Sequence, residues 1–284
     1  MESVRRPAVA GAFYDEDRER LEASLRRCFL PPLGPGEAPS GNAGPPSRIF
    51  GLVVPHAGYQ YSGPAAAWAY AALAQDGTPE TAVILGTNHQ SVGSPIAVSP
   101  ARQWVTPLGR VDVDVELADA LLQAAPRAEF NAEAHEFEHS IEVQVPFLQF
   151  LFAGRVKLLP IAVAGLRAAT AIEFGESLER VLRSRAAVII ATTDFSHYVP
   201  QPEAESLDRE AIEQIVSLNP EELLRRVQLH DISMCGHGPV AALLAAARAR
   251  GGVVGRLLKY HTSGDITGDR HSVVGYASLV IERG

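Results

Sequence analysis

Four apolar runs in the first two thirds of the chain constrain its fold more than any other feature. Each run is rich in apolar and β-branched residues and does not alternate with polar ones, and helical stretches lie between and after the runs. Strands of this kind are covered on both faces, as in a parallel sheet between layers of helices. The sequence therefore predicts an α/β fold with a largely parallel central sheet. The predicted strands are 49–54, 82–85, 156–163 and 187–192, with two later strands at 253–260 and 272–281.

Helical patterns predict the elements between these strands. The first predicted helix, residues 15–30, has acidic residues in its first turn and arginines near its end, as the helix macrodipole favours. A proline- and glycine-rich loop, residues 31–47, follows it. We interpret residues 1–284 as one domain, because too few residues precede this loop to form a separate core. The other predicted helices are 64–74, 114–124, 139–152, 170–184, 203–217, 220–228 and 238–250.

Composition and charge argue against several classes of function. The 284 residues are 46% hydrophobic and 20% charged, and their net charge is −8. An acidic chain without a basic tract is not expected to bind nucleic acid or an anionic membrane. No apolar run approaches the roughly 20 residues that span a bilayer, and the first residues lack the apolar segment of a signal peptide. The two cysteines form no disulfide framework, so we expect a cytoplasmic protein.

Polar clusters lie where the predicted strands end. In open α/β sheets, binding sites form beyond the carboxyl ends of the strands, so one sheet edge would bring these clusters together. Glycines beside the clusters allow backbone and ligand to approach closely. The clusters contain His56, then Asn88 and His89, then Asp194, Ser196 and His197, then Cys235 and His237, with His135, Glu138, His139 and Glu142 near the start of a predicted helix.

Each cluster taken alone has a structural explanation. A histidine after a strand is commonly a hydrogen-bonded turn residue, Cys235 could be a buried thiol, and Asp194 could cap the next segment. Taken together, imidazole, thiolate and carboxylate groups are ligands of transition metals. We therefore predict a metal or catalytic site, although the dispersed spacing does not identify the direct ligands. The chain has no G-x-S-x-G, Walker or G-x-G-x-x-G motif.

These clusters, in this order, resemble the Memo family, and more specifically component B of the prokaryotic AmmeMemoRadiSam system. The resemblance covers nearly the whole chain and implies a three-layer α/β/α sandwich similar to class III extradiol ring-cleaving dioxygenases. The stretches that carry it are "RPAVAGAFYDED" (6–17), "PHAGYQYSGPAAAWAY" (55–70), "ILGTNHQ" (84–90), "EHSIEVQVPFLQ" (138–149), "TTDFSHY" (192–198) and "CGHGPV" (235–240).

The resemblance also implies roles for individual residues. His56, His89 and Cys235 occupy the positions of the family's metal ligands. The side chains of Asp194, His197 and His139 are expected to line the same pocket, with His197 as the acid/base histidine. Ring-cleaving dioxygenases use a carboxylate where this chain has Cys235, and a thiolate is a softer ligand that can itself be oxidised. We expect one transition metal ion, with iron preferred over copper or zinc. Because Cys235 replaces the carboxylate of the dioxygenases, the type of reaction stays open.

Three functions are compatible with these residues. The first is a redox metalloenzyme with a dioxygenase-like site. The second is an adaptor without turnover, which by resemblance would work with a radical SAM protein and a companion small protein of the same system. The third is a zinc-dependent hydrolase, because two histidines and a cysteine can leave a coordination position open for water.

Overall fold

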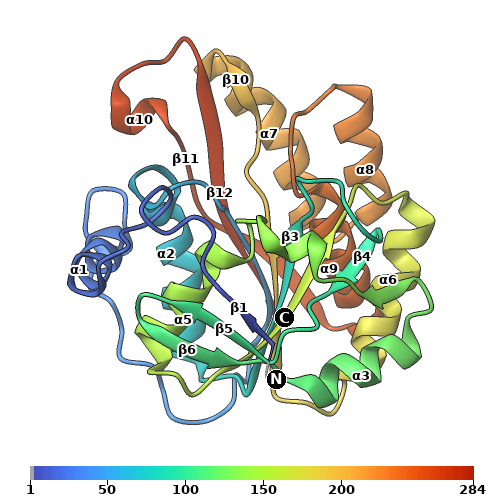
Figure 1. Cartoon of the computed structure of the whole chain (residues 1–284). Coiled ribbons are helices and arrows are strands. Elements are labelled where there is room, and N and C mark those ends of the chain that lie inside the picture. Colours follow the sequence, from blue (N-terminus) through green and yellow to red (C-terminus); the bar gives the residue numbers. More distant parts are fainter. Residues whose placement is uncertain (1–2) are drawn as a thin grey trace.

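The computed structural model describes residues 3–284, and a nine-stranded sheet lies at its centre (Figure 1). The strands are β2 Ile49–Val54, β3 Thr81–Thr87, β4 Ile96–Val98, β7 Ala128–Phe130, β8 Lys157–Val163, β9 Ala187–Thr192, β10 His197–Val199, β11 Val253–Thr262 and β12 Val273–Arg283. Their order is β10-β12-β2-β9-β3-β8-β4-β7, and β11 pairs with β12 outside this path. The central pairs β2–β9, β9–β3 and β3–β8 are parallel, which confirms the predicted sheet.

Helices cover both faces of the sheet. One layer consists of α1 Arg18–Phe29, α2 Tyr59–Asp76 and α5 Val145–Phe152, and the other of α3 Val115–Ala124, α6 Ala168–Leu182, α7 Gln201–Val216, α8 Pro220–Leu229 and α9 His237–Arg250. The central strands contribute to both cores in alternation. In β2, for example, Leu52 and Val54 belong to the core under α2, whereas Val53 belongs to the core under α9. The three-layer α/β/α arrangement is therefore confirmed.

The start of α2 differs from the prediction. Periodicity and Pro64 suggested a helix from residue 64, but α2 begins at Tyr59. The backbone N–H of Tyr59 donates to the Phe13 carbonyl, and its hydroxyl donates to the Val143 carbonyl at 2.7 Å. Contacts with segments distant in sequence thus anchor the extra turn, and such contacts leave no helical pattern in the local sequence.

A second, three-stranded sheet was not predicted. It consists of β1 Val4–Arg5, β5 Gln103–Thr106 and β6 Gly109–Asp112, in the order β1-β5-β6. These strands are too short to display a distinct periodic pattern. The predicted helix 139–152 also starts later: a 3₁₀ turn at Glu142–Gln144 leads into α5, so His139 lies in the loop before it.

The parallel central strands position the site. Because β2, β9 and β3 are neighbours, their last residues, Val54, Thr192 and Thr87, meet at one edge of the sheet. A short helix, α4 Glu133–Glu136, precedes the loop that carries His139, and another, α10 Gly264–Thr267, lies between β11 and β12 (Figure 1). No helix among residues 3–284 combines the length and apolarity needed to cross a membrane.

Candidate metal centre

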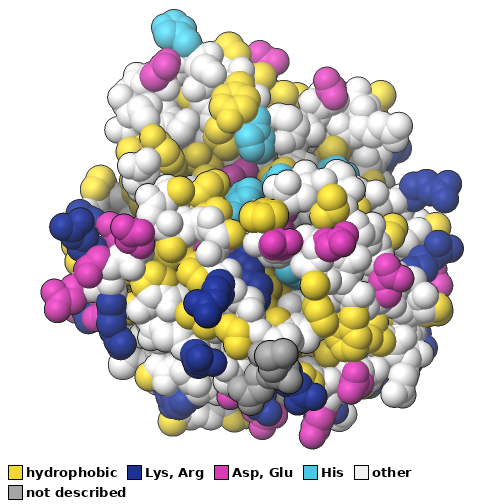
Figure 2. Space-filling model, in the orientation of Figure 1, with side chains coloured by type: hydrophobic (Ala, Val, Ile, Leu, Met, Phe, Trp, Pro, Cys, Tyr) yellow, Lys and Arg dark blue, Asp and Glu magenta, His cyan; other side chains and the backbone are white. Residues whose placement is uncertain are grey.

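A cavity of about 560 Å³ lies beyond the carboxyl ends of the central strands. Its polar lining includes the five predicted side chains His56, His89, His139, Asp194 and His197. Aromatic residues form much of the remaining wall, namely Phe13, Tyr61, Tyr198 and Tyr276. Histidine side chains gather around the hollow near the middle of the face drawn in Figure 2.

His56 follows β2 and is held in place from two sides. Its backbone N–H donates to Asp194 Oδ1 at 2.8 Å, and its Nδ1 lies 2.8 Å from Thr192 Oγ1. The ring is 1% exposed, and burial holds the pKa of His56 well below its usual value, with the neighbouring His139 and His89 lowering it further. The imidazole is therefore neutral at pH 7, as a metal ligand must be.

Glu138 connects the other two histidines. Its carboxylate accepts the His89 backbone N–H at 2.7 Å and the His89 Nδ1–H at 2.9 Å, and it lies 3.5 Å from His139 Nδ1. Burial by itself raises the pKa of Glu138, but the hydrogen bonds from His89 and from the Ser140 N–H outweigh it and hold the pKa at about 2. An ionised carboxylate on Nδ1 fixes the tautomer of His89 and leaves its Nε2 as the available ligand atom.

The nitrogen atoms of three histidines converge in this cavity. One ring nitrogen from each of His56, His89 and His139 lies within 4.8 Å of the others. The His89 and His139 rings stack at 4.6 Å between centroids, and the His56 ring meets both edge-on. Burial lowers the pKa of His139 to about 4, so this imidazole is neutral at pH 7. Three converging imidazoles, two of them with the buried Glu138 carboxylate behind them, fit a transition metal ion.

Cys235 also lies close to His56. Its Sγ is 3.1 Å from His56 Nε2 and accepts the Asp194 backbone N–H at 3.3 Å. Burial, with Asp194 adding to it, raises the pKa of the Cys235 thiol to about 12, so the thiol would be deprotonated only on binding a metal. The next residue, Gly236, allows the chain to pass close to the end of β9, because a Cβ atom on residue 236 would overlap the Thr192 carbonyl oxygen. The structure therefore offers two candidates for a third ligand. His139 joins His56 and His89 in the three-histidine cluster, whereas Cys235 lies beside His56 but does not belong to that cluster among the described residues.

Asp194 and His197 lie on the segment that follows β9. Burial raises the pKa of Asp194 to about 6, although the His56 N–H that it accepts lowers it. His197 Nδ1 is 2.9 Å from the Ser233 carbonyl oxygen, which can only accept, so Nδ1 carries the proton. With Nδ1 committed to this carbonyl, Nε2 is the ring atom of His197 left to accept a proton, and the side chain lines the cavity.

Two parts of the site were missed from the sequence. The sequence places Glu138 in a polar cluster but assigns it no specific role, whereas in the structure it is fully buried against His89. The segment after β1 was not linked to the site, yet the Phe13 ring packs against the His139 ring in a tilted arrangement, with 4.6 Å between centroids. The position of Glu138 directly before His139 in "EHS" was the only sequence signal for its role. The sequence held no comparable signal for Phe13.

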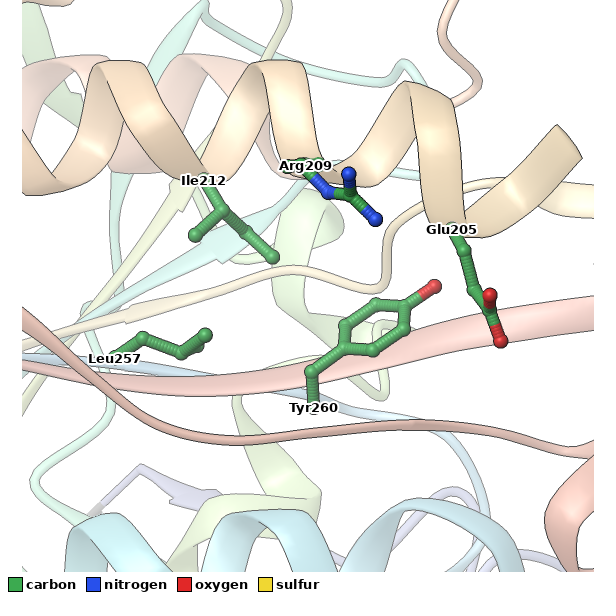
Figure 3. Close-up of a pocket in the computed structure, with 5 residues that line it drawn as sticks. All are labelled: Glu205, Arg209, Ile212, Leu257 and Tyr260. Carbon is green, nitrogen blue, oxygen red and sulfur yellow. The ribbon is translucent and has the colours of Figure 1, made fainter. Parts of the chain in front are cut away.

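A separate cavity of about 270 Å³ lies between α7 and β11 (Figure 3). Its lining consists of Glu205, Arg209, Ile212, Leu257 and Tyr260. None of these five residues is a histidine or a cysteine, and Figure 3 shows the Arg209 and Glu205 side chains on either side of the Tyr260 hydroxyl. This cavity is not a candidate for the metal centre.

Comparison with known proteins places the chain in a family. A model of the family described as "Memo-like protein" matches residues 5–280. A MEMO1 family protein of Methanopyrus kandleri is 46% identical over 282 residues, which cover 99% of both chains. A MEMO1 family protein of Methanothermobacter thermautotrophicus is 44% identical over 278 residues, 97% of this chain and 99% of the relative.

One solved structure supports the fold alone. An uncharacterized protein from Escherichia coli K12 matches with a TM-score of 0.59 at 16% identity, and the match covers 84% of this chain and 100% of the other. The sequence relatives carry the assignment, because they match along nearly the full length at more than 40% identity. This chain belongs to the Memo family.

Proposed function

We propose that this Memo-family chain is a metalloprotein that holds one transition metal ion, iron in preference to copper or zinc, at His56, His89 and Cys235. The observation that carries the proposal is the fixed orientation of His89, whose Nδ1–H is bound by buried Glu138 while a ring nitrogen of His56 lies within 4.8 Å of one of its own. Donor atoms on one tetrahedral ion are about 3.5 Å apart, given bonds of about 2.0–2.3 Å. The 3.1 Å between His56 Nε2 and Cys235 Sγ is near this value.

The other cavity residues have distinct tasks in this proposal. A bound redox-active ion would supply Lewis acidity and electron transfer to a substrate in the cavity. His197 accepts or returns a proton through Nε2, because its Nδ1–H is committed to the Ser233 carbonyl. Asp194 holds the His56 backbone, and His139, which packs against Phe13, lines the same cavity. The aromatic walls exclude water from a bound substrate.

Metal analysis of protein purified without oxygen tests the proposal. We expect about one equivalent of iron, with oxygen consumption in a substrate screen if the site is redox-active. Zinc as the retained metal, with metal-dependent hydrolysis and no oxygen consumption, would favour the hydrolase instead. Protein that retains no transition metal, and binds none on addition, would refute the metal site altogether.

Binding of Co²⁺ tests whether Cys235 or His139 is the third ligand. Thiolate complexes of Co²⁺ show charge-transfer absorption in the near ultraviolet, and complexes without a thiolate ligand lack it. We expect Cys235→Ser to lose this absorption and His139→Ala to keep it, because the proposal makes Cys235 a direct ligand. Cys28→Ser is the matched control, since Cys28 is the other cysteine and lies buried on α1. Loss of Co²⁺ binding in His139→Ala, with an unchanged spectrum in Cys235→Ser, would instead indicate a three-histidine site.

The Glu138 carboxylate, which binds His89 Nδ1–H, should have a measurable effect on metal affinity. We expect Glu138→Gln to weaken metal affinity about 10–100-fold, the usual cost of losing a carboxylate that orients a histidine ligand. Competition with a chromophoric chelator measures this affinity. Glu136→Gln, an exposed neighbour two residues away, should leave it unchanged. Equal affinities in the wild type and Glu138→Gln would show that Glu138 does not support the metal.

A second candidate function is partner binding, and Tyr198 favours it. This ring is 78% exposed on the cavity wall, and its backbone has a φ of 60°, an unusual conformation for a bulky residue. We infer a cytoplasmic protein that works with a radical SAM protein and a companion small protein of the AmmeMemoRadiSam system. Binding of either purified partner to the wild type, weakened in Tyr198→Ala, would support this reading; absence of binding would exclude it.

A further inference from the structure

A small cavity of about 70 Å³ lies at the edge of the sheet opposite the histidine cavity. It is formed where β2 and β9 begin and where α9 and β12 end. Four arginines from these separate elements line it, namely Arg48, Arg185, Arg250 and Arg283. Such a concentration of positive charge contrasts with the net charge of −8 for the chain.

The carboxylates around this cavity do not balance its arginines. Glu282 is shared by Arg48 at 3.0 Å and Arg256 at 2.8 Å. Glu179 is likewise shared by two arginines, Arg183 and Arg250, at 3.0 Å each. Four guanidinium groups therefore share two carboxylates.

Two further arginines add to this excess. Arg185 and Arg283 both line the cavity, and neither forms an ion pair with any residue from 3 to 284. The nearby carboxylate of Asp76 is occupied by the backbone N–H groups of Arg48 and Ile49. Even with Asp76 counted, positive charge exceeds negative charge here.

Arg250 also has an unsatisfied donor at this place. Its Nε is buried and, although 3.0 Å from Glu179 Oε1, is not aligned for a hydrogen bond with any described group. Burial lowers the pKa of Arg250, and Arg183 and Arg283 lower it further against the opposing effect of Glu179. A buried guanidinium N–H without an acceptor is costly, and an anion in the cavity would remove that cost.

We propose that this arginine-lined cavity binds an oxoanion, specifically a phosphate group, either free or as the end of a phosphomonoester. The volume suits one phosphate group, and the planar guanidinium groups of arginine match phosphate oxygens in geometry. The site is independent of the metal centre, because it lies at the amino-terminal ends of the strands whose carboxyl ends carry the histidines.

Isothermal titration calorimetry of the full chain with inorganic phosphate tests this site, with NaCl of equal ionic strength as the reference. We expect saturable binding of one phosphate. Arg185→Gln and Arg283→Gln should each weaken it about tenfold, the cost of one charge-assisted hydrogen bond. A parallel titration with glycerol 3-phosphate separates the two sources: comparable affinity indicates a phosphomonoester, and binding of inorganic phosphate alone indicates the free ion.

Two control variants make the result specific. Arg209→Gln removes the same charge from the exposed arginine in Figure 3 and should bind phosphate as the wild type does. His56→Ala should also retain phosphate binding, because the metal centre is not involved. The proposal is overturned if phosphate gives no more heat than NaCl, if neither cavity arginine matters, or if His56→Ala abolishes binding.

Discussion

Replacing His56 with alanine is expected to abolish stoichiometric metal binding, with affinity falling more than about 100-fold, beyond the usual cost of losing an orienting residue. The His56 ring lies close to both candidates for the third ligand, with its Nε2 3.1 Å from Cys235 Sγ and its centroid 5.5 Å from that of His139. The variant therefore loses a ligand whichever of the two completes the site. Metal content after anaerobic purification and chelator competition both measure the effect.

His261→Ala is the matched control for this prediction. His261 is also buried, at 3% exposure, but its Nε2 is bound to the Tyr61 carbonyl and it does not belong to the three-histidine cluster. It should bind metal as the wild type does, even if its stability falls. Equal metal content in His56→Ala and His261→Ala would show that the cluster is not the metal centre.

Replacing Glu142 with alanine is expected to lower the free energy of unfolding by about 3–5 kcal/mol, because it leaves Arg5 buried without its partner. The Glu142 carboxylate is fully buried and forms an ion pair with Arg5. It also accepts the backbone N–H of Ala8 at 2.8 Å and the Tyr14 hydroxyl at 2.5 Å. Urea denaturation followed by circular dichroism measures the change.

The Arg5–Glu142 ion pair and its hydrogen bonds also support residues of the metal centre. Arg5 donates to the Glu138 carbonyl, and the segment that Glu142 holds carries Phe13 onto the His139 ring. Glu142→Ala should therefore weaken metal binding as well as the fold. Glu136→Ala, at an exposed position, should change stability by no more than about 0.5 kcal/mol. A loss below about 1 kcal/mol in Glu142→Ala would mean that water replaces the carboxylate in this network.

Much of the central fold was predictable because it depends on local patterns. The continuous apolar runs correctly indicated that β2, β3, β8 and β9 are buried on both faces. Their shared direction follows from the helices between them, and parallel strands end at a common edge. The small sheet that includes β1 was not predictable, because a two-residue strand has no periodicity and depends on β5, about a hundred residues later.

The amino-acid sequence is sufficient to identify which chemical groups follow the strands: an imidazole after β2, another after β3 and a carboxylate after β9. The reason is that strand ends can be recognised where apolar runs stop at polar residues. The folded chain is needed to see that Glu138, 49 residues after His89, holds that ring, and that His139 and Cys235 both lie near His56. Loops bring these groups together by long-range packing, and no local spacing records which loops will meet.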